Sequence, residues 1–223
     1  MIVMPHVFIS RLNAIVDVEI ANRAGWAPVD LAAAYVQGGA RFLQIRAKAS
    51  TGAAFLDLAT RVSDLAHRAG AIVLVNDRAD IARLSDADGV HVGQDDLSPA
   101  AARAIVGAEA IVGVSTHTTG QIAAAVAAPI TYLAVGPVFG TSTKETGYTA
   151  VGLERVREAA EQVRRRSPSA HVVAIGGITL ENAGFAIQAG ATSVAVITDL
   201  LATGDPAARV AAYLARLGET GNV

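Results

Sequence analysis

The 223-residue chain contains no cysteine, which excludes disulfide bonds, thiolate metal sites and a cysteine nucleophile. Aromatic residues make up only 4% of the sequence and the net charge is -2, so the chain offers few platforms for base stacking and no basic surface for nucleic acid. Charges or glycines interrupt the apolar segments before they reach the length of a bilayer span, and Met1 opens no signal-like segment. We therefore expect a soluble, cytoplasmic protein that binds neither nucleic acid nor membranes.

The hydrophobic content of 52% is high, and only 17% of the residues are charged, so the chain has ample material for one core. We expect a single domain over residues 1–223. Short β-branched runs alternate with longer Ala-rich stretches of helical period, which predicts repeated βα units around a parallel sheet. The predicted strands are Val7–Ser10, Phe42–Arg46, Ile72–Asn76, Gly89–Val92, Ile111–Ser115, Tyr132–Gly136, Val172–Gly176 and Ser193–Thr198.

Eight βα units predict an α/β fold of the (β/α)8 TIM-barrel type, with an open doubly wound sheet as the alternative. Polar residues follow nearly every predicted strand, as in Asn76-Asp77 and Ser115-Thr116-His117. A barrel gathers the residues at the carboxyl ends of all its strands, whereas an open sheet places functional residues mainly at one switch point. The distribution of polar residues therefore favours the barrel.

Two groups of polar residues suit a diphosphate and its metal. If the strand alternation continues, Gln44, Arg46 and Lys48 share one face and present an amide and two cations. Asp77 and Asp96 follow neighbouring strands, and Mg²⁺ prefers one or two carboxylates together with water and phosphate oxygens. For Asp96 alone, helix capping is the simpler interpretation; next to these cations, a Mg²⁺ site explains the pair better.

The segment Val135–Lys144 turns an apolar strand into a loop rich in phosphate-binding side chains, namely Thr141, Ser142, Thr143 and Lys144. The glycine and threonine residues from Gly140 to Thr149 suggest a lid; composition alone favours an ordinary connection, but direct continuation from the Thr141–Lys144 cluster favours the lid. Gly176-Gly177 and Thr198 follow the last two predicted strands, where TIM barrels often hold a phosphate against backbone amides. We therefore expect two anion sites that face each other across one barrel mouth.

The order and spacing of several motifs resemble the thiamine-phosphate synthase family. The motifs are QIRAK at 44–48, NDR at 76–78, GVHVGQDD at 89–96, GVSTH at 113–117, GPVFGTSTK at 136–144 and AIGGI at 174–178. The resemblance implies a TIM barrel that joins a hydroxymethylpyrimidine diphosphate to a thiazole phosphate, with release of diphosphate and with Mg²⁺. It also implies a dissociative reaction in which the pyrimidine loses diphosphate before the thiazole nitrogen attacks, so that no protein nucleophile is needed.

The resemblance assigns roles to individual residues. It implies that Arg46, Lys48, Ser115 and Lys144 take part in catalysis and that Asp77 and Asp96 hold the metal. The residues that would bind the pyrimidine diphosphate are Gln44, Arg46, Lys48, Asn76, Ser115 and Lys144. The residues that would hold the thiazole phosphate are Thr141, Thr143, Gly177, Ile197 and Thr198, and Ser142 stands among the hydroxyls of the same loop.

The chain departs from the family pattern at three places. Ala47 stands where the family usually has an acidic residue, Thr198 stands where it has a serine, and the predicted first strand at Val7–Ser10 lacks the usual acidic end. A related thiazole tautomerase shares the barrel but tends to lose the diphosphate and metal residues, and a non-catalytic binder of the same small molecules is a third possibility. Retention of Arg46, Lys48, Asp77, Asp96 and Lys144 favours the synthase, for which we allow a homo-oligomer. We assign the five histidines no catalytic role.

Overall fold

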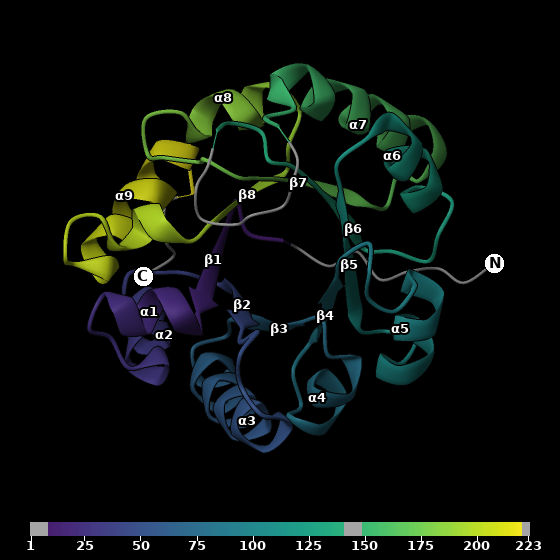
Figure 1. The fold of residues 1–223 in the computed structure, drawn as a ribbon. Helices are drawn as coiled ribbons and strands as arrows, with labels where there is room; N and C mark the ends of the chain where they lie inside the picture. Colours follow the sequence, from purple (N-terminus) through teal and green to yellow (C-terminus); the bar gives the residue numbers. More distant parts are fainter. Residues whose placement is uncertain (1–8, 141–148, 220–223) are drawn as a thin grey trace.

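A computed structural model describes residues 9–140 and 149–219. Its eight strands pair in parallel and in sequence order, and β8 closes against β1 (Figure 1). The strands are β1 Leu12–Asp17, β2 Phe42–Arg46, β3 Ile72–Asn76, β4 Gly89–Val92, β5 Ile111–Thr116, β6 Tyr132–Val135, β7 His171–Ile175 and β8 Ser193–Val196. This closed barrel confirms the predicted (β/α)8 fold.

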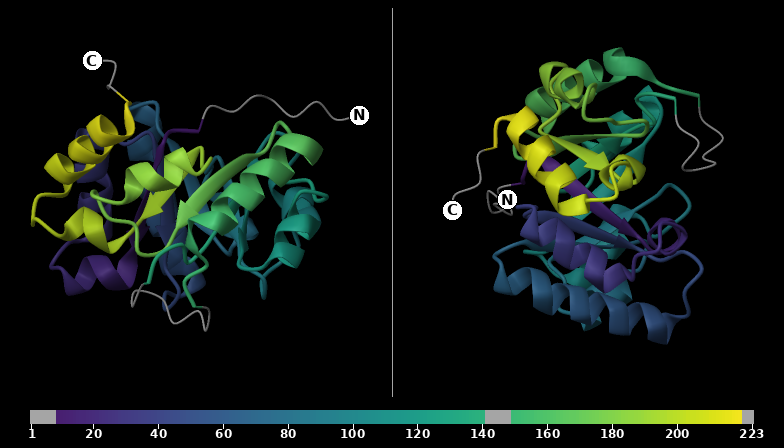
Figure 2. Two further views of the ribbon diagram at one scale, coloured as in Figure 1. Left: turned by 90° about the horizontal axis from the view of Figure 1, so that it is seen from above. Right: turned by 90° about the vertical axis from the view of Figure 1, so that its left-hand side faces the viewer.

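Helices surround the barrel and cover its outer face, as the views along and across its axis show (Figures 1 and 2). They are α1 Val18–Arg23, α2 Pro28–Gln37, α3 Gly52–Arg68, α4 Ala79–Leu84, α5 Pro99–Val106, α6 Thr119–Ala125, α7 Gly152–Arg166, α8 Ala183–Gln188 and α9 Pro206–Leu217, with a 3₁₀ helix, η1, at Thr198–Leu201. Within the described ranges, no helix combines the length and apolar character that a membrane crossing requires.

The helix α3 illustrates how the sequence specifies this outer layer. Thr51 caps its N-terminus, where the hydroxyl accepts a hydrogen bond of 3.3 Å from the amide of Ala54. Phe55, Ala59 and Val62 are buried and recur at helical spacing, so one face of the helix packs on the barrel. Burial of this face ties the helix to the strands that carry the polar residues at their carboxyl ends.

The strand alternation separates an outer core from an inner one. In β2, Leu43 and Ile45 pack toward the helices, whereas Phe42 belongs to the cluster inside the barrel. Inside, the ring of Phe42 meets Tyr132 edge to face, with 6.1 Å between the ring centroids. Gly113 lies opposite Tyr132, and a Cβ at this glycine would come within 2.1 Å of the tyrosine ring. The missing side chain of Gly113 therefore makes room for the aromatic centre of the barrel.

The prediction of the first strand was wrong. Ile9 and Ser10 have no strand structure, residues 7 and 8 lie outside the described part of the chain, and β1 instead spans Leu12–Asp17. Asn13 breaks the apolar pattern of this segment, yet it is buried, with 1% of its surface exposed. A polar residue inside a barrel strand removed the signal on which the strand prediction depended.

Candidate active site

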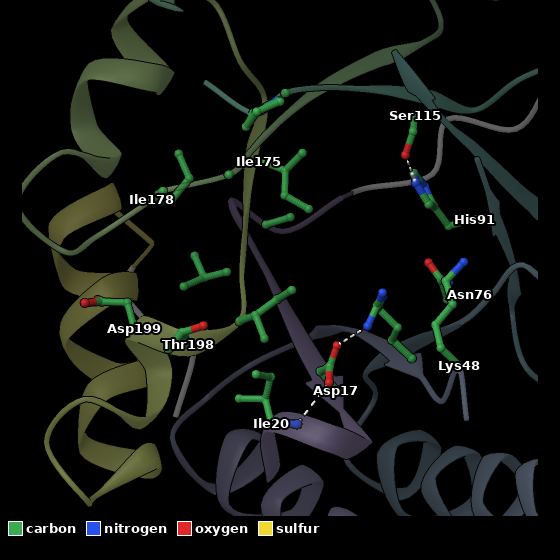
Figure 3. Close-up of a pocket in the computed structure, with 18 of the residues that line it drawn as sticks. Asp17, Ile20, Lys48, Asn76, His91, Ser115, Ile175, Ile178, Thr198 and Asp199 are labelled. Atoms are coloured by element: carbon green, nitrogen blue, oxygen red, sulfur yellow. Dashed lines mark hydrogen bonds and ion pairs between the residues drawn. The ribbon is translucent and has the colours of Figure 1, made fainter. Parts of the chain in front are cut away.

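A cleft of about 1270 Å³ lies at the carboxyl ends of the strands. Such a volume exceeds the typical range for one small ligand, roughly 300–1,000 Å³, and therefore suits two substrates together. Figure 3 shows Lys48, Asn76 and Ser115 on one side of the cleft, and Thr198 and Asp199 on the other. Loops from both halves of the barrel thus contribute to one cavity, as expected of a TIM-barrel site.

Two acidic side chains and a lysine lie close together on the side of the cleft that carries Lys48. The ammonium of Lys48 lies 2.7 Å from Oδ2 of Asp77, and Oδ2 of Asp96 accepts a hydrogen bond of 2.7 Å from the amide of Gly93. Burial raises the pKa of Asp77, the neighbouring Asp96 carboxyl raises it further, and Lys48 opposes the rise. The φ of Asp77 is 67°, a left-handed conformation that sharply redirects the chain after β3.

The donor set of this side fits Mg²⁺. No group of three or more potential metal ligands occurs in the described residues, so Asp77 and Asp96 would bind a cation as a pair. Two adjacent carboxylates whose mutual repulsion raises a pKa gain from a divalent cation between them, and Mg²⁺ commonly completes its shell with water and phosphate oxygens. This arrangement is compatible with a metal that binds together with a phosphorylated substrate.

A hydrogen-bonded chain supports Ser115 from inside the barrel. The Nε2 atom of His91 lies 2.8 Å from the Ser115 hydroxyl, and its Nδ1 atom lies 2.8 Å from the hydroxyl of Tyr132. Burial raises the pKa of Tyr132, so this hydroxyl keeps its proton and can donate it to Nδ1. A neutral His91 then carries its proton on Nε2 and can donate to Ser115, which leaves the serine proton for a ligand.

The residue Arg46 pairs with an acid that sequence reasoning missed. Its Nη1 atom lies 2.5 Å from Oδ2 of Asp17 and 4.0 Å from Oε2 of Glu19. Asp17, at the end of β1, is 3% exposed and also caps α1 through the amide of Ile20. The first strand therefore has the acidic end that the predicted segment lacked, and a correct placement of the strand would have revealed it.

The opposite side of the cleft comes from the loops after β7 and β8. Gly177, Ile197 and Thr198 line it, and Ile197 is buried whereas Thr198 is exposed. The φ of Gly177 is +64°, and a Cβ there would lie 2.5 Å from the carbonyl oxygen of Gly140. Glycine is thus needed here for the path of the backbone itself, in addition to any close approach of a ligand.

The structure locates the other predicted site residues as follows. Gln44 is buried at 3% exposure and is not among the residues that line the cleft, while Asn76 is buried and does line it. Thr141, Ser142, Thr143 and Lys144, and with them most of the predicted lid at 140–149, lie outside the described residues. Ala47, at the family's usual acidic position, packs in the outer core.

Two further residues at the cleft received no role from the sequence. His117 lines the cleft, and its Nδ1 donates a hydrogen bond of 2.6 Å to the carbonyl of Gly136. Asp199 lines it as well and binds Arg209 and Tyr213 of α9. The strand-end position of both residues was visible in the sequence, but their partners depend on the tertiary fold.

Comparisons with known proteins agree with this geometry. Residues 12–200 match the sequence model of the family described as thiamine monophosphate synthase. A thiamine-phosphate synthase of Koribacter versatilis is 44% identical over 209 residues, which cover 92% of this chain and 94% of that protein. One from Gloeobacter violaceus is also 44% identical, over 80% of this chain, which spans about half (51%) of the length of that relative.

A solved structure supports the same assignment. The thiamine phosphate pyrophosphorylase from Pyrococcus furiosus superposes with a TM-score of 0.82 and 27% identity, over 94% of this chain and 96% of that one. The barrel, the cleft and the sequence similarity over most of the chain lead to one conclusion. The chain belongs to the thiamine monophosphate synthase family of enzymes.

Proposed function

We propose that this enzyme joins a hydroxymethylpyrimidine diphosphate to a thiazole phosphate and releases diphosphate and thiamine phosphate. The observation that supports it best is one cleft of about 1270 Å³ that is lined on one side by Lys48, Asp77 and Asp96 and on the other by Gly177 and Thr198. Two phosphorylated substrates can then bind side by side, with their charged groups at opposite ends.

The first side would bind and activate the pyrimidine diphosphate. Asp77 and Asp96 would hold Mg²⁺, which neutralises charge on the departing diphosphate when it is bound. Lys48 would leave Asp77 for a diphosphate oxygen, since a phosphate offers the ammonium a stronger acceptor than a carboxylate already shared with a metal. Ser115, held by His91, would donate its hydroxyl proton to the pyrimidine.

The second side would hold the thiazole phosphate close to the reacting carbon. Thr198 and the backbone around Gly177 would bind the phosphate, so the thiazole ring points back across the cleft toward the pyrimidine. Departure of diphosphate leaves a cation on the pyrimidine methylene carbon, and the thiazole nitrogen then forms the new carbon–nitrogen bond with its lone pair. Proximity and charge stabilisation supply the catalysis, and no side chain needs to attack the substrate.

Diphosphate release from the two purified substrates tests this function. We expect release that requires both the pyrimidine diphosphate and Mg²⁺, and formation of thiamine phosphate only when the thiazole phosphate is added. Isomerisation of a thiazole carboxylate phosphate without diphosphate release would favour the tautomerase instead. Tight binding of both compounds without any turnover would identify a binding protein and refute the proposal.

A further inference from the structure

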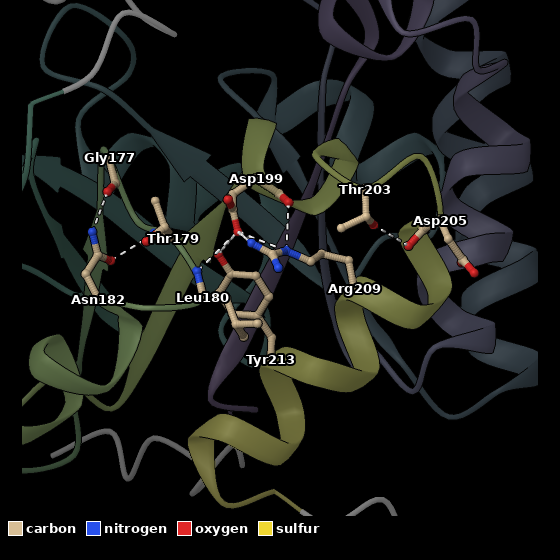
Figure 4. Close-up of polar contacts among 9 residues, drawn as sticks. All are labelled: Gly177, Thr179, Leu180, Asn182, Asp199, Thr203, Asp205, Arg209 and Tyr213. Carbon is tan, nitrogen blue, oxygen red and sulfur yellow. Dashed lines mark hydrogen bonds and ion pairs between the residues drawn. The ribbon is translucent and has the colours of Figure 1, made fainter.

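A partly buried charge network joins the loop after β8 to α9 (Figure 4). Oδ2 of Asp199 accepts hydrogen bonds of 2.7 Å from Nη2 of Arg209 and 2.5 Å from the hydroxyl of Tyr213. The side chains of Asp199 and Arg209 are only 16% and 14% exposed. A carboxylate with these donors is held in one orientation, directly after Thr198 in the sequence.

The same carboxylate reaches the loop after β7. Oδ2 of Asp199 also accepts a hydrogen bond of 3.2 Å from the amide of Leu180. Within that loop, the side chain of Asn182 accepts a hydrogen bond of 2.8 Å from the amide of Thr179 and donates one of 2.9 Å to the carbonyl of Gly177. The turn from Gly177 to Asn182 is therefore fixed internally by Asn182 and externally by Asp199. Both loops of the second side of the cleft depend on one carboxylate.

The negative charge of Asp199 also affects how a phosphate binds nearby. Asp199 lines the cleft with its carboxylate turned toward α9 (Figure 3), and at this short range an uncompensated negative charge would repel a phosphate bound at Gly177 and Thr198. Arg209 is not among the residues that line the cleft, but its Nε and Nη2 atoms lie 3.2 and 2.7 Å from Oδ2 of Asp199. The guanidinium can therefore cancel this negative charge without contacting the ligand.

We propose that Asp199 and Arg209 are positioning residues that set the affinity for the phosphate of the thiazole substrate. Asp199 holds the loops after β7 and β8 together, and Arg209 neutralises the carboxylate beside the phosphate. This inference rests on the proposed function, because that function defines which substrate binds on this side. It assigns neither residue a contact with the reacting atoms.

Three variants separate this role from simple structural support. Arg209→Gln leaves the Asp199 charge uncompensated, and Asp199→Asn removes that charge while retaining an oxygen acceptor. Arg155→Gln is the matched control, because Arg155 forms a similar pair of 2.6 Å with Glu158 but does not line the cleft. For each variant, calorimetry measures the Kd of thiazole phosphate directly, and steady-state kinetics measure the KM of both substrates.

We expect Arg209→Gln to raise the Kd of thiazole phosphate by about tenfold or more, the effect of one uncompensated charge near an anion. The KM of the pyrimidine diphosphate should change by less than about twofold, because that substrate binds across the cleft. Asp199→Asn should weaken the binding of thiazole phosphate less than Arg209→Gln does. Arg155→Gln should change the binding of neither substrate.

Equal increases in both KM values, or an unchanged Kd in Arg209→Gln, would overturn the proposal. So would a greater loss in Asp199→Asn than in Arg209→Gln. Should Arg209→Gln fail to fold, Tyr213→Phe takes its place: it removes one hydrogen bond to Asp199, and it must alter the Kd of thiazole phosphate while sparing the KM of the pyrimidine. Wild-type protein that binds thiazole phosphate without turnover would refute only the proposed function, since the binding comparison still stands.

Discussion

Removing one partner of the Asp17–Arg46 pair should lower the stability of the protein by several kcal/mol, and substitution can measure this. Asp17 is 3% exposed and the Arg46 side chain is 17% exposed, so the Asp17 carboxylate in particular has little solvent to replace a lost partner. Removing one partner of a buried pair costs about 3–5 kcal/mol. We therefore expect Asp17→Asn, which keeps an oxygen for the helix cap, to lower the free energy of unfolding by about 3 kcal/mol.

The cap adds a second, separable contribution. Asp17→Ala also removes the hydrogen bond from the amide of Ile20, at 3.1 Å, so it should cost about 1 kcal/mol more than Asp17→Asn. Urea unfolding of Asp17→Asn, Arg46→Met and the double variant forms a double-mutant cycle. We expect a coupling free energy of about 2 kcal/mol, because the second substitution costs less stability once the partner charge is already gone. A coupling below about 0.5 kcal/mol would refute the conclusion that the two charges stabilise each other.

Two further predictions concern the cleft and the core. Asp96→Asn should lower kcat by about a hundredfold and weaken the dependence on Mg²⁺ concentration, because it removes one of two charged oxygen ligands. Turnover at limiting Mg²⁺ that matches the wild type would contradict the metal assignment. Gly113→Ala should lower the free energy of unfolding by about 3 kcal/mol or more, because its Cβ would come within 2.1 Å of the Tyr132 ring. If denaturant titration gave a free energy of unfolding within about 0.5 kcal/mol of the wild type, the ring would be able to move aside.

Most of the fold could be predicted from the sequence because compact β-branched runs are bounded by turn residues. The bounds of β2, β3 and β4 agree with the prediction, because each is a short, mainly apolar run with a clear end: β2 and β3 end at a polar residue, and β4 ends before Gly93. β1 failed because Asn13 lies inside a barrel strand, and apolar character alone pointed to the preceding segment. The acid at the end of that strand, Asp17, was lost with it.

The sequence also predicted some features of the candidate site and missed others. Lys48, Asn76, Asp77 and Ser115 could be found because they lie at or just after the carboxyl ends of strands, and a barrel brings all these ends to one face. The support of Ser115 by His91 and Tyr132 could not, because these residues come from three different strands. Such contacts depend on register and barrel closure, which local sequence patterns do not encode.

The central claim is that two substrates bind at opposite sides of one cleft, and a crossed kinetic comparison tests it most directly. Lys48→Ala removes a cation from one side, and Thr198→Val removes a hydroxyl from the other while keeping a similar shape. We expect Lys48→Ala to raise the KM of the pyrimidine diphosphate by about tenfold with little change for the thiazole phosphate, and Thr198→Val to show the reverse pattern. If both variants raised the KM of the same substrate, the assignment of the two sides would be wrong.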